Sequence, residues 1–172
     1  MARVIPGRTT HRHEGELVVF LIGMRVNKAW RPDQWLPVLA AMTPMLVELM
    51  KDRQSGLRGI RTTLGWRGPV LVQYWDSLEK LYAYASSSDQ AHRPAWTAFD
   101  RRARKAPGAV GIWHETFVVE RAESLYVGMP ASGLALATEA VPVGGRSDTA
   151  RARAAAGRTG GGAAGPAPAS AD

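Results

Sequence analysis

The sequence predicts an α+β fold, in which strands and helices follow one another in the order β-α-β-β-α-β, with a disordered C-terminal tail. Runs rich in β-branched and aromatic residues alternate with segments whose apolar residues recur at helical spacing. The tail is predicted because the composition changes from Ala137 onward, and residues 151–172 are nearly all Ala, Gly, Arg, Pro and Ser. Such a segment buries too little apolar surface to offset the entropy lost on ordering. At 172 residues the chain can hold one ordinary domain with a hydrophobic core.

The first half of the predicted domain contains a strand, a helix and a hairpin. Residues 17–24 are a β-branched and aromatic run that is typical of a central strand. A helix is predicted over about residues 30–50 from the spacing of its apolar positions, and Pro44 predicts a kink or a break within it. Residues 60–66 and 70–75 are the second and third strands, and the Gly-Pro turn between them predicts a hairpin.

The second half is predicted to contain helical segments and a last strand. Residues 77–84 form a short amphipathic helix with Ser77 as its N-cap. A second helical piece covers about residues 89–105, and residues 110–119 form the fourth strand. Residues 124–128 are a short additional strand candidate. This order of elements is the split βαβ of a ferredoxin-like domain.

The predicted boundaries are a flexible arm over residues 1–12, a ferredoxin-like domain over 13–137 and a disordered tail over 138–172. In this fold the helices cover one face of the sheet and leave the other bare. An apolar sheet face of that size needs covering, and many proteins of this shape pair their bare faces into a barrel. We therefore expect a homodimer, as a dimeric α+β barrel.

Composition excludes several classes of function. The chain has no cysteine, which excludes disulfides, thiolate metal sites and cysteine nucleophiles. The first ten residues hold no apolar signal core, and the longest apolar run is too short to span a membrane, so we expect a cytoplasmic protein and no membrane partner. The net charge of +7 raises the question of nucleic acid. The one dense basic cluster, within residues 101–105, lies near the end of a predicted helix, where the helix dipole favours it. No nucleic-acid-binding motif is present, and no such partner is expected.

Six short blocks carry a resemblance to a known family. They are residues 18–27, 73–75, 92–96, 111–115, 126–130 and 133–134. In this order they resemble a family of largely uncharacterised bacterial and fungal proteins that is related to the polyketide monooxygenase of the fumagillin pathway. That family sits beside the antibiotic-biosynthesis monooxygenases, whose domains are dimeric ferredoxin-like barrels. The resemblance covers about residues 10–136.

The resemblance implies an oxidoreductase, a cofactor-independent monooxygenase that acts on a hydrophobic, polyketide-like small molecule. In such enzymes a substrate that forms a stabilised carbanion reacts with oxygen directly, with no metal. The protein supplies a base, a polar group that holds the enolate oxygen and an apolar pocket. His92 and His114 are the best candidate bases because imidazole titrates near neutral pH. The expected catalytic residues are His92, His114 and Tyr74, and the expected substrate-binding residues are Asn27, Trp30, Gln73, Trp75, Trp96 and Trp113.

Strand alternation limits which of these residues can meet. In the fourth strand it places His114 on one face of the sheet and Trp113 and Glu115 on the other. His114 and Glu115 therefore cannot face the same cavity in a regular strand. Structural roles stay open for both histidines, His114 as a hydrogen-bonded sheet residue and His92 as a local helix cap.

Two further readings stay open. Heme-degrading proteins and aldoxime dehydratases share this barrel and bind heme through a helix histidine, a role that would fall to His92, with Asn27 in the distal pocket. Alternatively, the same dimeric barrel is a non-catalytic small-molecule-binding protein. No pair of histidines and carboxylates has metal-ligand spacing on one helix face, so no metal site is expected.

Overall fold

The strands of this protein form two antiparallel sheets, one in each of two compact units. The computed structural model describes residues 2–87 and 92–157, and for residues 92–96 it describes the backbone alone. Val18–Phe117 form the central unit, and the described residues before and after that range form the second.

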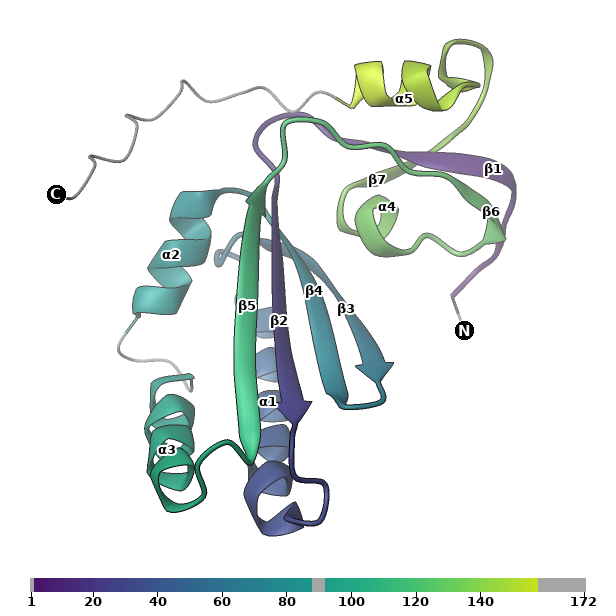
Figure 1. The fold of residues 1–172 in the computed structure, drawn as a ribbon. Helices are drawn as coiled ribbons and strands as arrows, with labels where there is room; N and C mark the ends of the chain where they lie inside the picture. The colour runs from purple at the N-terminus through teal and green to yellow at the C-terminus, as the bar shows by residue number, and fades with distance from the viewer. Residues whose placement is uncertain (1, 88–91, 158–172) are drawn as a thin grey trace, which may run out of the picture. The chain divides into compact units, whose positions relative to one another are not determined.

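The central unit has the predicted ferredoxin-like fold (Figure 1). Its sheet has the strand order β3-β4-β2-β5, which is the order of a split βαβ fold. Its elements are β2 (Val18–Val26), α1 (Pro32–Lys51), β3 (Leu57–Gly65), β4 (Gly68–Trp75), α2 (Leu78–Ser86), α3 (His92–Lys105) and β5 (Val110–Val118).

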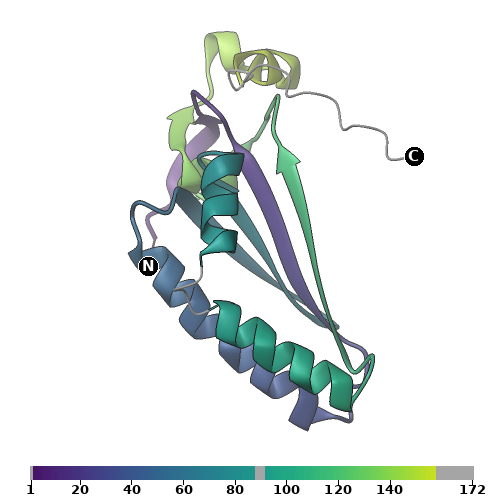
Figure 2. The same cartoon turned by 90° about the vertical axis from the view of Figure 1, so that its left-hand side faces the viewer.

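All three helices lie on the same face of this sheet (Figure 2). The alternation of β4 buries Leu71, Gln73 and Trp75 on that face. The register places Phe20 of β2 directly opposite Gln73, so both strands present alternate residues to the helices. Trp75 and Val18 are fully buried there and pack with Leu49 of α1 and Leu81 of α2 as the core. No helix among the described residues of this unit covers the other face.

Helix boundaries follow from local chemistry. Ser77 is the N-cap of α2, as predicted, and its hydroxyl accepts a hydrogen bond from the backbone N–H of Lys80 at 3.2 Å. Pro44 does not end α1, which continues from Pro32 to Lys51. Both Pro44 and Ala40, whose carbonyl loses its helical partner, are exposed. Water can therefore hydrate that carbonyl, which lowers the cost of the proline.

On the other face of the sheet, the indole of Trp113 lies against Gly23. A Cβ atom at Gly23 would come within 2.5 Å of two ring carbons of Trp113. Glycine is therefore required here for close approach, since any side chain would displace the indole. Tyr74 and Val72 of β4 alternate with the buried residues and also belong to this face.

The second unit differs from the expected arm and tail. Its strands are β1 (Ile5–Arg12), β6 (Tyr126–Met129) and β7 (Glu139–Pro142), in the order β6-β1-β7. It also contains α4 (Gly133–Ala137), the short helix η1 (Gly145–Ser147) and α5 (Ala150–Ala156). The strand candidate at residues 124–128 overlaps β6. Residues 158–172, the rest of the predicted tail, lie outside the described residues.

Hydrogen bonding of buried polar residues explains why the amino-acid composition did not predict this unit. The inner residues of β1 are Thr9, Thr10 and His11, each at most 7% exposed, and β1 pairs on both edges. Backbone ladders and side-chain hydrogen bonds, rather than apolar burial, therefore order this strand. A prediction based on apolar surface alone leaves out these hydrogen bonds.

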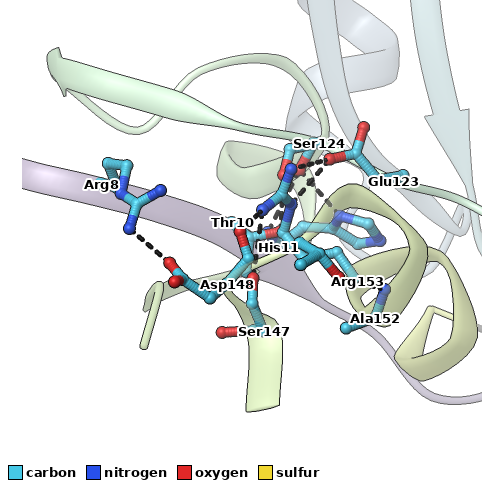
Figure 3. Close-up of polar contacts among 10 residues, drawn as sticks. Arg8, Thr10, His11, Glu123, Ser124, Ser147, Asp148, Ala152 and Arg153 are labelled. Atoms are coloured by element: carbon cyan, nitrogen blue, oxygen red, sulfur yellow. Dashed lines mark hydrogen bonds and ion pairs between the residues drawn. The ribbon is translucent and has the colours of Figure 1, made fainter. Parts of the chain in front are cut away.

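The central residue of α5 is a buried arginine (Figure 3). Arg153 is 7% exposed, and its Nε donates to the carboxylate of Glu123 at 2.7 Å. Its Nη1 also donates to the backbone carbonyls of Ser147 and Asp148, both at 3.1 Å. One guanidinium thus joins α5 to the segment before β6 and to the turn at η1.

His11 forms a second polar link in this unit (Figure 3). Its Nδ1 lies 2.8 Å from Oγ of Ser124, and Oγ1 of Thr10 donates to the Ser124 carbonyl at 2.7 Å. Burial, together with the nearby charge of His13, lowers the pKa of His11, and the Glu123 carboxylate opposes this shift.

Candidate active site

A mostly apolar cavity lies between the sheet and the helices of the central unit. Its larger part has a volume of about 240 Å³ and its smaller part about 80 Å³. Ile22, Met42 and Met45 line both parts, so the two parts adjoin. Small-molecule sites typically start at about 300 Å³, which the two parts reach together.

Helical and strand periodicity build this cavity. Met42, Met45 and Leu49 follow one another at the three- and four-residue spacing of one helix face in α1. Phe20 and Ile22 point to the same space from β2. Since methionine is flexible and polarisable, this lining can adapt to a ligand of irregular shape.

His114 brings an imidazole to the larger part of the cavity. It lines that part together with Thr116, and Ile112 of the same strand lines the smaller part. The predicted alternation therefore places His114 on the helix-covered face. Its ring centroid is 5.6 Å from that of Phe20, and neither ring nitrogen has a hydrogen-bond partner within the described residues. Both ring nitrogens are therefore available for hydrogen bonds to a ligand.

Gln73 brings an amide to the same space. Nε1 of the fully buried Trp75 donates to Oε1 of Gln73 at 3.0 Å. Because an indole N–H can only donate, this bond fixes the orientation of the carboxamide and leaves its NH₂ group for the cavity that Gln73 lines. That NH₂ group has no acceptor in the described part of the chain, although Gln73 is only 5% exposed.

Tyr84 is a cavity residue that the sequence analysis missed. Its ring lies 5.5 Å from that of Trp75, and it lines the larger part of the cavity from α2. Burial, and to a lesser degree the Glu48 carboxylate, raises the pKa of Tyr84, so its phenol stays protonated near neutral pH. The amphipathic spacing of α2, with Leu81 buried and Tyr84 three residues later, is the signal that would have found it.

The predicted site residues divide between different parts of the unit. The cavity brings together His114 and Gln73, and Trp75 lies beneath Gln73. Tyr74 and Trp113 belong to the opposite face of the sheet and line neither part of the cavity.

Asn27 and Trp30 lie in the segment between β2 and α1. Oδ1 of Asn27 accepts a hydrogen bond from Nε of Arg25 at 3.0 Å, and Trp30 is 74% exposed. Neither residue lines the cavity. His92 and Trp96 belong to α3, but their side chains lie outside the described residues.

The described residues contain no group of three or more histidines, cysteines or carboxylates that could hold a metal ion. None of the described helices has the length and apolar character needed to cross a membrane.

The chain is thus a ferredoxin-like α+β protein with a mostly apolar cavity between the sheet and the helices of its central unit. Residues 17–134 match the family described as monooxygenase af470-like, and the chain belongs to this family. The resemblance found in the sequence blocks is thereby confirmed. The chain is 28% identical over 151 residues to monooxygenase af470 of Aspergillus fumigatus, across 74% of this chain and 52% of that protein. It therefore spans about half the length of that relative.

Solved structures are similar to this chain at lower identity. An aldoxime dehydratase (OxdRE) in complex with butyraldoxime has a TM-score of 0.54 and 18% identity, over 68% of this chain and 37% of that one. SnoaB, a cofactor-independent oxygenase from Streptomyces nogalater, has a TM-score of 0.42 and 15% identity, over 63% of this chain and 97% of that one. The likeness to the aldoxime dehydratase shows the fold.

Proposed function

We propose that this protein is a cofactor-independent monooxygenase that oxidises a hydrophobic, polyketide-like small molecule in the cavity between its sheet and helices. The observation that carries the proposal is that two groups line the same mostly apolar cavity. They are the imidazole of His114, which has no hydrogen-bond partner within the described residues, and the NH₂ group of Gln73. Membership of a monooxygenase family supports the same reaction class. Base, donor and apolar lining are the three parts that this chemistry requires.

The proposed reaction begins at an acidic C–H group of the substrate. His114 removes the proton, and the NH₂ group of Gln73 donates to the enolate oxygen on which the negative charge develops. Dioxygen adds to the carbanion carbon to give a peroxide anion. This anion takes the proton to become a hydroperoxide, which loses water. A methylene group and one O₂ thus give a carbonyl group and one H₂O, with no other oxidant. The apolar lining surrounds the carbanion, while the exposed His114 keeps its imidazole in reach of solvent.

His92 is proposed as a second base because its helix, α3, contributes Ala98, Phe99 and Arg102 to the lining of the cavity. In the proposed reaction His114 alone can remove the first proton from the substrate. The effects of His92→Ala and His114→Ala should therefore be measured separately.

The test uses 1,8-dihydroxyanthrone, a polycyclic compound with an acidic methylene group, with oxygen uptake and quinone absorbance as readouts. His114→Ala should lower the rate above background by at least about 100-fold, which is the lower end for loss of a general base. Glu115→Gln is the matched control, since Glu115 alternates to the other face of the same strand and should keep the rate. A folded His114→Ala variant with unchanged turnover would refute the role of His114. Saturable binding of the anthrone without oxygen uptake would favour the non-catalytic binding protein instead.

Heme is the alternative cofactor, and it would require His92 as the ligand. The cavity offers one described imidazole, His114, from a strand rather than from a helix. Titration with hemin tests this alternative. A Soret band that saturates at one heme per chain, and that His92→Ala abolishes, would replace the cofactor-independent proposal.

We also propose a homodimer formed through the uncovered face of the central sheet. Val72 and Tyr74 are half-buried on this face, and Phe117 is 49% exposed. A second copy would remove these apolar groups from water. Light scattering after size-exclusion chromatography should give the mass of two chains, and a monomer at micromolar concentration would refute the proposal.

A further inference from the structure

The smaller part of the cavity ends at an arginine. Arg102 and Phe99, three residues apart on α3, line this part together with Met24 and Ile112. Arg102 also lines an adjoining hollow of about 270 Å³ together with two other cations. It is half-buried, so its guanidinium lies where an apolar space meets a positively charged surface.

The guanidinium of Arg102 has no carboxylate partner within the described residues. Its only hydrogen bond there is from Nη1 to the Ala98 carbonyl of its own helix, at 3.4 Å, a long contact. Five other arginines pair with carboxylates, namely Arg8, Arg12, Arg31, Arg58 and Arg153. Arg102 thus keeps most of its donors for another acceptor.

The neighbouring charges also favour an anion. Arg101 and Lys105 line the adjoining hollow, and among the described residues no acidic side chain lines that hollow or the smaller part of the cavity. The nearest acidic residue along the helix, Asp100, is exposed and lines neither space. Clustered positive charge beside low-dielectric walls raises the local concentration of anions.

We propose that Arg102 binds the carboxylate of the ligand, so that the site prefers an apolar carboxylic acid to a neutral apolar molecule of the same shape. The inference rests on the proposed function in one respect, that this cavity is the substrate site. Since the two parts of the cavity adjoin, one molecule can place its carboxylate at Arg102 and its reactive carbon near His114. Arg102 is then a specificity-determining residue, and its planar fork suits a bidentate carboxylate.

The experiment compares two probes of nearly equal shape, 2-naphthoate and the uncharged 2-naphthamide, by calorimetry on the 172-residue chain. The wild-type protein should bind naphthoate at least about tenfold more tightly, the difference expected for a charge-assisted hydrogen-bond pair. Arg102→Met should remove this preference and leave the naphthamide affinity within about twofold. Arg102→Lys should keep part of the preference, since it retains the charge without the fork. Arg104→Met is the matched control, because Arg104 is exposed on the same helix and lines neither part of the cavity.

Equal affinity of the wild-type protein for the two probes would overturn the inference, as would failure of both probes to bind. Loss of the preference in Arg104→Met to the same extent as in Arg102→Met would also overturn it, because the effect would then be general surface charge. Circular dichroism of each variant shows whether it is folded. The readout is binding, so its outcome is distinct from that of the oxygen-uptake assay. A naphthoate preference without oxygen uptake supports the role of Arg102 and contradicts the proposed monooxygenase. Oxygen uptake without a naphthoate preference supports the monooxygenase and contradicts the role of Arg102.

Discussion

The hydrogen bond between Trp75 and Gln73 predicts how substitutions at these two positions change the stability of the protein. Trp75 is fully buried, and its Nε1 donates to Oε1 of Gln73 at 3.0 Å. In Gln73→Leu the side chain keeps a similar volume, but the indole N–H loses its acceptor with no water to replace it. A buried donor without a partner costs about 1–3 kcal/mol. For a chain of this length that corresponds to a melting temperature lower by about 2–4 °C per kcal/mol.

A double-mutant cycle separates this hydrogen bond from changes in packing. Trp75→Phe removes the donor and also leaves a cavity, so it should be strongly destabilising by itself. Adding Gln73→Leu to Trp75→Phe should then cost less than it does alone, because no buried N–H remains unpaired. We expect a coupling free energy of about 1–2 kcal/mol between the two positions in urea unfolding followed by circular dichroism.

The control and the refuting result follow from the same geometry. Gln54→Leu makes the same chemical change at an exposed position, and the free energy of unfolding should change by no more than about 0.5 kcal/mol. Additivity of Gln73→Leu and Trp75→Phe within about 0.3 kcal/mol would show that the hydrogen bond contributes nothing. The orientation of the Gln73 amide, and with it the NH₂ donor of the proposed site, would then lose its support.

Two further predictions concern the second unit. Arg153→Met should destabilise the second unit by about 3 kcal/mol, measured by hydrogen exchange of the β1 amides. This value is the lower end for a broken buried ion pair, because Glu123 is partly exposed. Arg151→Met, an exposed change on the same helix, should alter exchange little. Because burial lowers the pKa of His11, the unfolded chain binds a proton there more readily than the folded chain does. Stability should therefore be complete above about pH 6.5 and fall as the pH decreases below it. His11→Gln, which can still bond to Ser124, should reduce the difference in β1 exchange between pH 7.5 and pH 5.5, and an unchanged difference would contradict this assignment.

The sequence predicted the central unit because each of its elements has a local signal. Apolar runs identified its four strands, a helical period identified α1, and Ser77 marked the start of α2. The strand order then followed from the short hairpin and from the two helical connections. The second unit has no such signals, because β1 pairs with two strands that lie more than a hundred residues further along the chain. Pairing over that distance depends on tertiary structure, which composition does not report.

The site was predictable in part for the same reason. Alternation separated His114 from Glu115, but it did not determine which of the two faces the helices. That assignment depends on the register between strands, which places Phe20 opposite Gln73 and both toward the helices. Arg102 was interpreted from sequence as part of a basic helix end, and only the packing of α3 against α1 brings it to the cavity.

Consecutive motif residues on a strand cannot all belong to one site. Gln73, Tyr74 and Trp75 form a single block in the sequence, yet the pleat sends the first and third to the helix-covered face and the second to the other. If the uncovered face is a dimer interface as proposed, Tyr74 contributes to assembly and Gln73 to the reaction. A Tyr74→Lys substitution should then yield a monomer that still prefers naphthoate to naphthamide, since Arg102 lies on the opposite side of the sheet within the same chain. Loss of the preference together with the dimer would instead show that the cavity is completed by the second copy.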